Sequence, residues 1–171
     1  MKNTLKIILL LLVLFNFVGC GYTPSSKFAR QTLGEKISTS VVISALDPEN
    51  TVLIKDAVDS SLIQVFHSSL VDKNISDTHL VLKMSEPLYT PIIYDSNGYI
   101  IGYRMSITLF ISRYHNGVST KYTTRGNFDF KVAPNAVVTD KDRFDAIKVS
   151  AEKAIRAFIA QVSAEGARAK E

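Results

Sequence analysis

The sequence of 171 residues contains little of what most metal and redox sites require. Its single cysteine excludes an internal disulfide framework and a cysteine-rich zinc module. The three histidines, His67, His79 and His115, are far apart in the sequence and lack the spacing of metal ligands. We therefore expect no metal site and no cofactor.

The motifs of common enzymes are missing as well. The chain has no Gly-Xaa-Ser-Xaa-Gly elbow, no phosphate-cradling loop and no His-Glu-Xaa-Xaa-His pattern. Asp140, Asp142 and Asp145 lack the glycine and the terminal glutamate of a calcium loop, and acidic residues in the first turn of a helix explain them better. The sequence therefore predicts a protein that is not an enzyme and has no catalytic residues.

Residues 1–19 have the pattern of a signal peptide. Two lysines precede an apolar run over residues 7–18, and a core of about 12 residues is typical of a secretory signal, whereas a membrane-spanning helix needs about 20. The segment ends in Gly19-Cys20, with Phe17 where leucine is usual, and resembles the bacterial lipoprotein signal, in which the cysteine is acylated. The alternative is an uncleaved anchor or an ordinary signal with an incidental cysteine. We predict lipidation of Cys20.

Acylation of Cys20 would fasten the chain to a membrane, and residues 20–36 are predicted to form the lipidated tether. Each buried methylene contributes roughly 0.8 kcal/mol, so two or more acyl chains hold a protein durably. Gly21 is not the aspartate associated with inner-membrane retention, so the resemblance implies the periplasmic side of the outer membrane. Cleavage would remove two of the 20 basic side chains and none of the 16 acidic ones. The mature chain is then nearly neutral, and we expect no nucleic acid partner.

The rest of the chain predicts one domain over residues 37–165, followed by a polar tail over 166–171. The predicted elements are a strand over 37–45, a helix over 48–71, an extended segment over 79–94, strands over 99–114 and 118–132, and a helix between Thr139 and Gly166. The order β-α-β-β-β-α predicts an α+β two-layer sandwich, in which two helices pack on one face of a four-stranded mixed sheet. The first two strands should form a parallel right-handed crossover.

Asn116-Gly117 is a strong signal for a two-residue hairpin turn and fixes the pairing of the strands that flank it. With these residues in the turn, Met105 pairs with Phe128. The apolar side chains of both strands then fall on one face without a slip, which supports this register.

The same register places the charged side chains of the hairpin on the opposite face. Arg104 meets Asp129, which offers a cross-strand ion pair of roughly 0.2–1 kcal/mol. Lys121 and Arg125 meet no acidic residue in this hairpin. We predict that these two residues, with Arg104 as a third candidate, contact an anionic lipid. Solvated surface charge is the alternative for each of them.

A second candidate surface is the segment between residues 88 and 100. The strand over 99–114 could reach about 53 Å if unbroken, whereas the first predicted helix covers only about 36 Å. The segment would then project as an arm with apolar residues on both faces, which usually marks a partner surface. The alternative is that its prolines fold it back onto the core. The predicted partner contacts are Leu88, Tyr89, Ile92, Ile93, Tyr94, Tyr99 and Ile100.

These features together resemble the LptE family, the lipoproteins that help to assemble and plug the outer-membrane lipopolysaccharide translocon. The resemblance rests on Cys20-Gly21-Tyr22, the polar leader, the Ser- and Val-rich first strand and the element order up to Ser163. It implies a complex with the β-barrel protein LptD, partial residence inside that barrel, and contact with lipopolysaccharide during its delivery to the outer leaflet. No individual binding residue of the family is carried over to this chain.

Two other functions fit a tethered adaptor. An accessory lipoprotein of a phospholipid-trafficking ABC system would bind an inner-membrane permease and would present a lipid-sized apolar cavity. An activator of peptidoglycan synthesis would bind a penicillin-binding protein. Affinity purification followed by mass spectrometry separates these alternatives, because each predicts a different partner.

Overall fold

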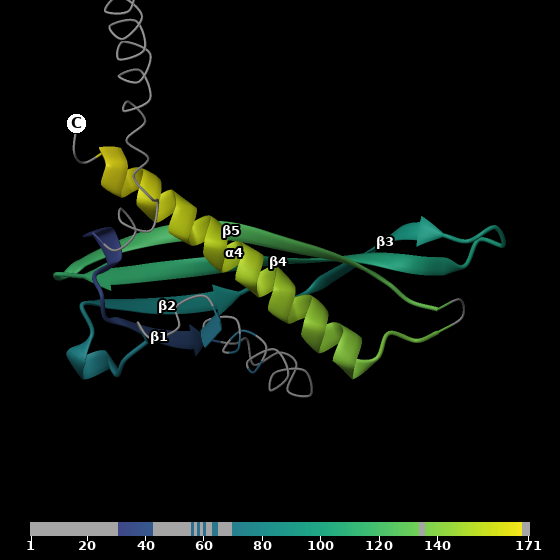
Figure 1. Cartoon of the computed structure of the whole chain (residues 1–171), viewed down its shortest axis with the longest axis horizontal. Coiled ribbons are helices and arrows are strands. Elements are labelled where there is room, and N and C mark those ends of the chain that lie inside the picture. The colour runs from purple at the N-terminus through teal and green to yellow at the C-terminus, as the bar shows by residue number, and fades with distance from the viewer. Residues whose placement is uncertain are drawn as a thin grey trace, which may run out of the picture.

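The structure is a computed structural model, shown in Figure 1. It describes residues 31–42, 56, 58, 60, 63, 64, 70–133 and 136–168. The predicted signal peptide, Cys20 and the tether up to residue 30 lie outside the described residues, as do His67 and most of the predicted helix over 48–71. The described elements are β1 (Ile37–Val42), the 3-10 helix η2 (Lys73–Ile75), β2 (Thr78–Met84), β3 (Leu88–Tyr94), β4 (Ile100–His115), β5 (Val118–Lys131) and α4 (Asp140–Arg168).

Strand β4 is the centre of a mixed sheet, with α4 lying across one side of it (Figure 1). β5 pairs antiparallel with β4 along one edge, in the register that Asn116-Gly117 predicts. β2 and β3 both pair antiparallel with the other edge of β4, and β1 pairs parallel with β2. The structure therefore confirms the α+β two-layer fold and the parallel pairing of the first two strands.

The sheet has five strands in the described residues, not the predicted four, because the segment over 79–94 divides into β2 and β3. The division falls at Ser85. The Thr108 amide donates to the Ser85 hydroxyl at 2.9 Å, and the Ser85 amide donates to the Thr108 carbonyl, also at 2.9 Å. Met84 pairs with Leu109 but Leu88 pairs with Ser106, so one extra residue lies between the two strands. As in other β-bulges, the extra residue reverses the alternation, so that even-numbered side chains face the core on β2 and face the opposite side on β3.

The core lies between the sheet and α4. The odd-numbered residues of β4 from Met105 to Ile111 face α4 and are at most 1% exposed. On α4 they meet Phe158, whose ring packs edge-on against Tyr122 at a centroid distance of 5.0 Å. Val58, a described helical residue of the predicted first helix, is fully buried in the same cluster. The described part of the predicted first helix therefore contributes Val58 to the core that α4 and the sheet enclose.

The two ends of α4 differ in how well the sequence predicts them. At the start, the Asp142 carboxylate accepts hydrogen bonds from the Thr139 amide and hydroxyl, and the Asp142 amide donates to the Thr139 hydroxyl, as in a capping box. The predicted stop at Gly166 is wrong, because α4 continues to Arg168. Glu165 accepts a hydrogen bond of 2.7 Å from the Tyr122 hydroxyl, and this contact with β5 holds the last turns in helical form.

Candidate functional site

The side of the sheet opposite α4 is the first candidate site. We call it the open face; it is made by the even-numbered side chains of β4 and the odd-numbered side chains of β5, together with their neighbours on β1, β2 and β3. Its central residue, Phe110, is 46% exposed, whereas its neighbour along the strand, Leu109, is fully buried against α4. Large apolar side chains are therefore accessible between polar ones on this face.

Three cations surround Phe110 on the open face. Lys83 pairs with Phe110 from β2, and Thr123 pairs with it from β5. Lys121 and Arg125 lie two residues to either side of Thr123 and point to the same face. With strands about 4.8 Å apart and same-face neighbours about 6.7 Å apart, the three cationic residues have their Cα atoms within about 5–8 Å of that of Phe110. We call Lys83, Lys121 and Arg125 the cation triangle.

The cation triangle keeps its charge available. In the part of the chain that the structure describes, none of its three side chains forms an ion pair. The Nε atom of Arg125 donates to the Thr108 hydroxyl at 3.3 Å, which orients the guanidinium without neutralising it. Among the described strand residues, the only acidic side chain on the open face is Asp129, which lies four residues beyond Arg125 on β5. The triangle is thus a positive region with an apolar centre.

Arg104 is engaged elsewhere. Its Nε and Nη2 atoms donate to the two carboxylate oxygens of Asp129, both at 2.7 Å, which is the cross-strand ion pair that the register predicts. The guanidinium lowers the pKa of the Asp129 carboxyl below its ordinary value. The role of Arg104 in lipid binding stays a prediction, as do those of Lys121 and Arg125.

The sequence reasoning missed Lys83 as a member of this site. The sequence did indicate that Lys83 faces away from the core, because it lies between Leu82 and Met84, which both face the core. Its proximity to Phe110 depends on the register between β2 and β4, which no turn motif fixes. β2 and β4 are separated in the chain by β3 and a bulge. The pairing of Lys83 with Phe110 therefore cannot be worked out by counting residues from one hairpin turn.

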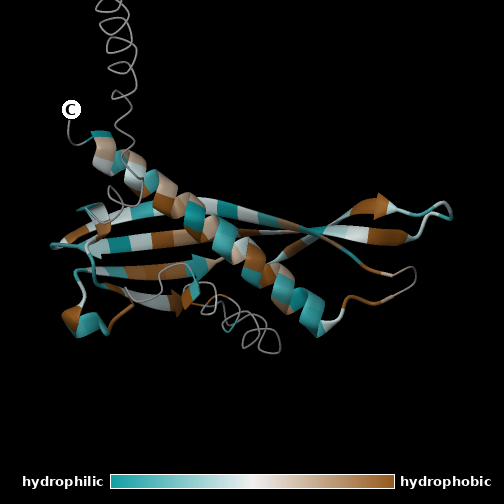
Figure 2. Cartoon of the chain, viewed as in Figure 1, coloured by the Kyte–Doolittle hydropathy of each residue, from teal (hydrophilic) through white to brown (hydrophobic). Residues whose placement is uncertain are grey.

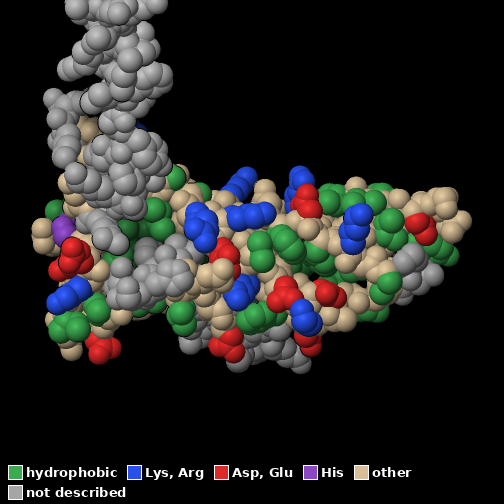
Figure 3. All heavy atoms as spheres, viewed as in Figure 1, with side chains coloured by type: hydrophobic (Ala, Val, Ile, Leu, Met, Phe, Trp, Pro, Cys, Tyr) green, Lys and Arg blue, Asp and Glu red, His purple; other side chains and the backbone are tan. Residues whose placement is uncertain are grey.

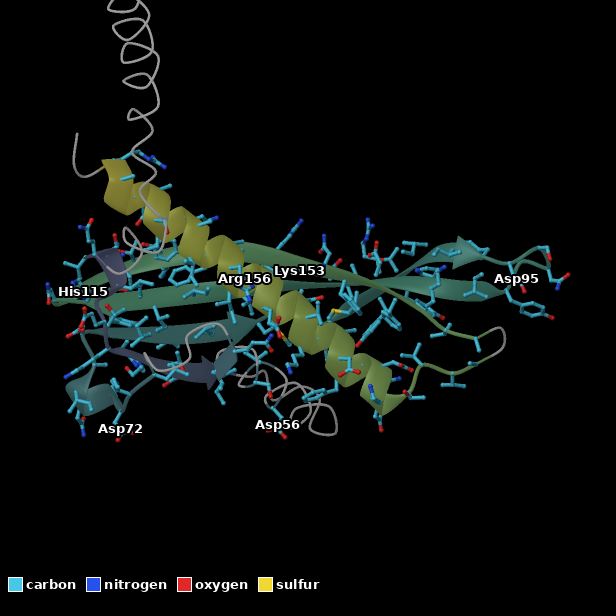
Figure 4. The ribbon with its side chains drawn as sticks, viewed as in Figure 1. Asp56, Asp72, Asp95, His115, Lys153 and Arg156 are labelled. Atoms are coloured by element: carbon cyan, nitrogen blue, oxygen red, sulfur yellow. The ribbon has the colours of Figure 1, made fainter. Side chains whose placement is uncertain are left out.

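The second candidate site is the arm, residues 88–100, which comprises β3, a turn and the start of β4. It extends beyond α4 (Figure 1), and Asp95 at its tip lies at the opposite end of the sheet from His115 (Figure 4). The projecting alternative is therefore the one that the structure supports. Among the predicted contact residues, Leu88, Tyr94 and Tyr99 are 62%, 57% and 51% exposed.

One predicted contact residue of the arm points inward instead. Tyr89 packs edge-on against Phe130 at 6.3 Å between ring centroids, and Tyr103 stacks on Phe130 at 5.9 Å. Burial raises the pKa of the Tyr89 hydroxyl. Nearby, Lys153 of α4 (Figure 4) donates to the Asn127 carbonyl at 2.8 Å and lies over the neighbouring Phe128 ring. These contacts join the base of the arm to the core.

The two described histidines are held by hydrogen bonds at the other end of the sheet. His79 lies 2.8 Å from the Ser38 hydroxyl, and burial lowers its pKa. His115 lies 2.9 Å from the Thr78 hydroxyl. Within the described ranges, no three His, Cys, Asp or Glu side chains are grouped as metal ligands, and none of the helices there has the length and hydropathy to cross a membrane.

Comparisons with known proteins show a shared fold. No protein-family model and no curated protein matches the sequence. Among solved structures, the chain is similar to a proposed lipoprotein from Caulobacter crescentus, with 14% identity, a TM-score of 0.50, and coverage of 86% of this chain and 97% of that one. It also matches the rare lipoprotein B from Shewanella oneidensis, with 10% identity, a TM-score of 0.40, and coverage of 78% and 92%. An uncharacterized lipoprotein B from Nitrosomonas europaea matches with 10% identity, a TM-score of 0.43, and coverage of 86% and 94%. At this identity, the similarity to the Caulobacter crescentus protein shows that the two chains have the same fold.

Proposed function

We propose that this protein is a lipoprotein of the outer membrane that binds lipopolysaccharide on its open face and works with an LptD-type β-barrel. It would be anchored on the periplasmic side through acylated Cys20, would plug the barrel, and would aid delivery of lipopolysaccharide to the outer leaflet. The observation that carries the proposal is the cation triangle around the exposed ring of Phe110.

The chemistry of the cation triangle suits an anionic amphiphile. Lys83 and Lys121 offer point charges, whereas Arg125 can bind a phosphate through two parallel hydrogen bonds. Lys121 and Arg125 are four residues apart on one strand, which separates their Cα atoms by about 13 Å. Two phosphate groups on one lipid headgroup can therefore be held at once, while Phe110 contacts the apolar part of the same molecule.

The barrel partner and the membrane location rest on sequence features. The apolar run that ends at Cys20 is the feature typical of an exported lipoprotein. A nearly neutral mature chain also suits a protein that meets lipids and a barrel at particular surfaces, because its binding does not depend on a large net charge.

Crosslinking to lipopolysaccharide in cells tests the proposal. A photoreactive amino acid at Thr123, an exposed position between Lys121 and Arg125, should crosslink to lipopolysaccharide. Adding Lys121→Glu and Arg125→Glu should reduce this crosslinking at least about tenfold, since a hydrogen bond to a charged group is worth roughly 1.5 kcal/mol or more.

The matched control carries the same change of charge on the other side of the molecule. Lys141→Glu with Arg156→Glu alters two exposed cations of α4 and should leave crosslinking unchanged. Equal crosslinking in both double variants would remove the cation triangle from the site. Affinity purification of the wild-type protein should recover a β-barrel; recovery of an inner-membrane permease or a penicillin-binding protein instead would favour the alternative functions.

A further inference from the structure

The end of the molecule that carries the arm bears little charge beyond Asp95 and Lys131, the last residue of β5, which pairs with Gly102. Between residues 87 and 103, Asp95 is the only charged residue. The linker residues that follow β5, which are 132–133 and 136–139, carry none. The two segments are neighbours, because the Val132 amide donates to the Ile101 carbonyl at 3.1 Å. Figure 2 shows hydrophobic stretches on both strands of the arm and in the linker, with a hydrophilic turn at the tip of the arm, and on the side drawn in Figure 3 this end presents mainly uncharged side chains.

The carboxylate of Asp95 is itself hydrogen-bonded within the arm. It accepts hydrogen bonds from the Asn97 amide at 2.9 Å and the Tyr99 amide at 2.8 Å, which closes the turn. The two exposed tyrosines of the arm, Tyr94 and Tyr99, flank this polar tip. In the linker, Val137 is 83% exposed. Exposed apolar side chains thus lie at alternate positions of β3, near the turn and in the linker, and those between them on β3 are partly exposed.

We propose that the arm and the linker insert into the interfacial layer of a phospholipid bilayer. A binding groove on a protein covers one face of a hairpin, whereas lipid surrounds an inserted segment on every side. The interior of an outer-membrane β-barrel is polar and so does not match a surface of this kind. Tyrosine is favoured at the boundary between headgroups and acyl chains, because its ring is apolar and its hydroxyl is wet. This assignment gives the arm a lipid partner in place of the protein partner that its apolar residues predict from the sequence.

The geometry agrees with the anchor of the proposed function, on which this inference rests. The described chain begins at Gln31, and Ile37 is paired through Thr78 with His115, at the end of the sheet away from the arm. The residues between Cys20 and Gln31 can span at most about 40 Å. β4 is about 53 Å long, so the tethered end of the sheet stays within about 40 Å of the membrane while the arm at the other end reaches the bilayer.

Spin labelling of the full-length acylated protein in vesicles tests this inference. Because Cys20 is acylated, Ile92→Cys introduces a single free thiol on the arm, which is labelled with a nitroxide. Val118→Cys is the matched control, because Val118 is 61% exposed at the opposite end of the sheet. Vesicles of phosphatidylethanolamine and phosphatidylglycerol supply the bilayer. Power saturation then compares collisions of each label with oxygen, which enters the bilayer, and with a water-soluble nickel chelate.

In vesicles, the label at residue 92 should collide several-fold more often with oxygen than with nickel, and the label at residue 118 should show the reverse. Equal and water-like accessibility at both positions would overturn the proposal. Mass spectrometry of the same samples reports the acylation of Cys20, so failure of the anchor is recognised separately from failure of the arm to insert.

A second variant tests the choice between lipid and barrel. Ile92→Ser with Tyr94→Ser should abolish the oxygen preference of a label placed at Tyr99 by Tyr99→Cys and should leave co-purification of the barrel unchanged. Loss of the barrel with no change at the Tyr99 label would assign the arm to a protein partner and overturn the proposal.

Discussion

The two parts of β4 differ in how their side chains are buried. From Met105 to Ile111 its side chains alternate between complete burial under α4 and partial exposure on the open face, where Phe110 is the most exposed. From Ile100 to Tyr103 the strand runs through the arm and its base, where Ile100, Ile101 and Tyr103 are all partly exposed and all apolar. In the first stretch one face of the strand is buried and the other is not, whereas in the second stretch both faces carry partly exposed apolar side chains. The difference teaches that alternation records which side of a strand is covered within the same chain, and that it is lost where neither side is fully covered.

The largest expected difference in stability is between removing an aromatic ring from the core under α4 and removing one from the arm. Phe158→Ala should cost about 3–5 kcal/mol of unfolding free energy, because the fully buried ring would leave a cavity between α4 and the sheet. Tyr94→Ala on the arm should change it by no more than about 0.5 kcal/mol, because this side chain is mostly exposed. Urea denaturation of both variants measures the difference. A similar loss in both would mean that the arm is part of the cooperative core.

Glycine substitutions sharpen the same comparison. A Cβ atom at Gly126 would lie 1.8 Å from the Ser150 carbonyl oxygen of α4, whereas a Cβ atom at Gly98 would meet nothing within 4 Å. Gly126→Ala should therefore destabilise the fold by about 3 kcal/mol through overpacking. Gly98 has a φ of +84°, so Gly98→Ala should cost only about 1 kcal/mol of backbone strain. Thermal denaturation measures both, and equal shifts in Tm would contradict the close contact between β5 and α4.

The smallest expected effect lies where the body of the sheet joins the arm. Arg104 lowers the pKa of Asp129, so the ion pair stabilises the folded state at neutral pH and the contribution is lost as the pH falls through the lowered pKa. Wild type should be slightly more stable than Asp129→Asn at about pH 6, and the two should converge once the pH has fallen below the lowered pKa of Asp129. Thermal denaturation of both proteins at several pH values measures the difference in their stability. A difference that is independent of pH would show that the ion pair does not contribute to stability.

Local signals in the sequence predict much of this molecule. Asn116-Gly117 fixes every pair of the β4–β5 hairpin, because a two-residue turn leaves one register. Thr139 and Asp142 mark the start of α4, because a capping box needs only four consecutive residues. These features depend on residues that are close in the sequence.

The features that the sequence does not predict depend on distant contacts. The bulge at Ser85 is defined by its hydrogen bonds to Thr108, which no local pattern announces. Lys83 joins the cation triangle only through the register with β4. Gly166 is a common helix stop, but the contact between Glu165 and Tyr122 carries α4 past it. In each case a residue on another element decides the outcome.

The extra residue between β2 and β3 has a consequence for how this chain can change over generations. Because the offset separates the pattern of Leu88–Tyr94 from that of Thr78–Met84, a single-residue deletion near Ser85 would reverse the faces of the β3 side chains while those of β2 stayed in the core. The reversal would take Tyr89 away from Phe130 and so loosen the base of the arm. Side chains beyond Tyr89 can therefore change without disturbing those that α4 covers.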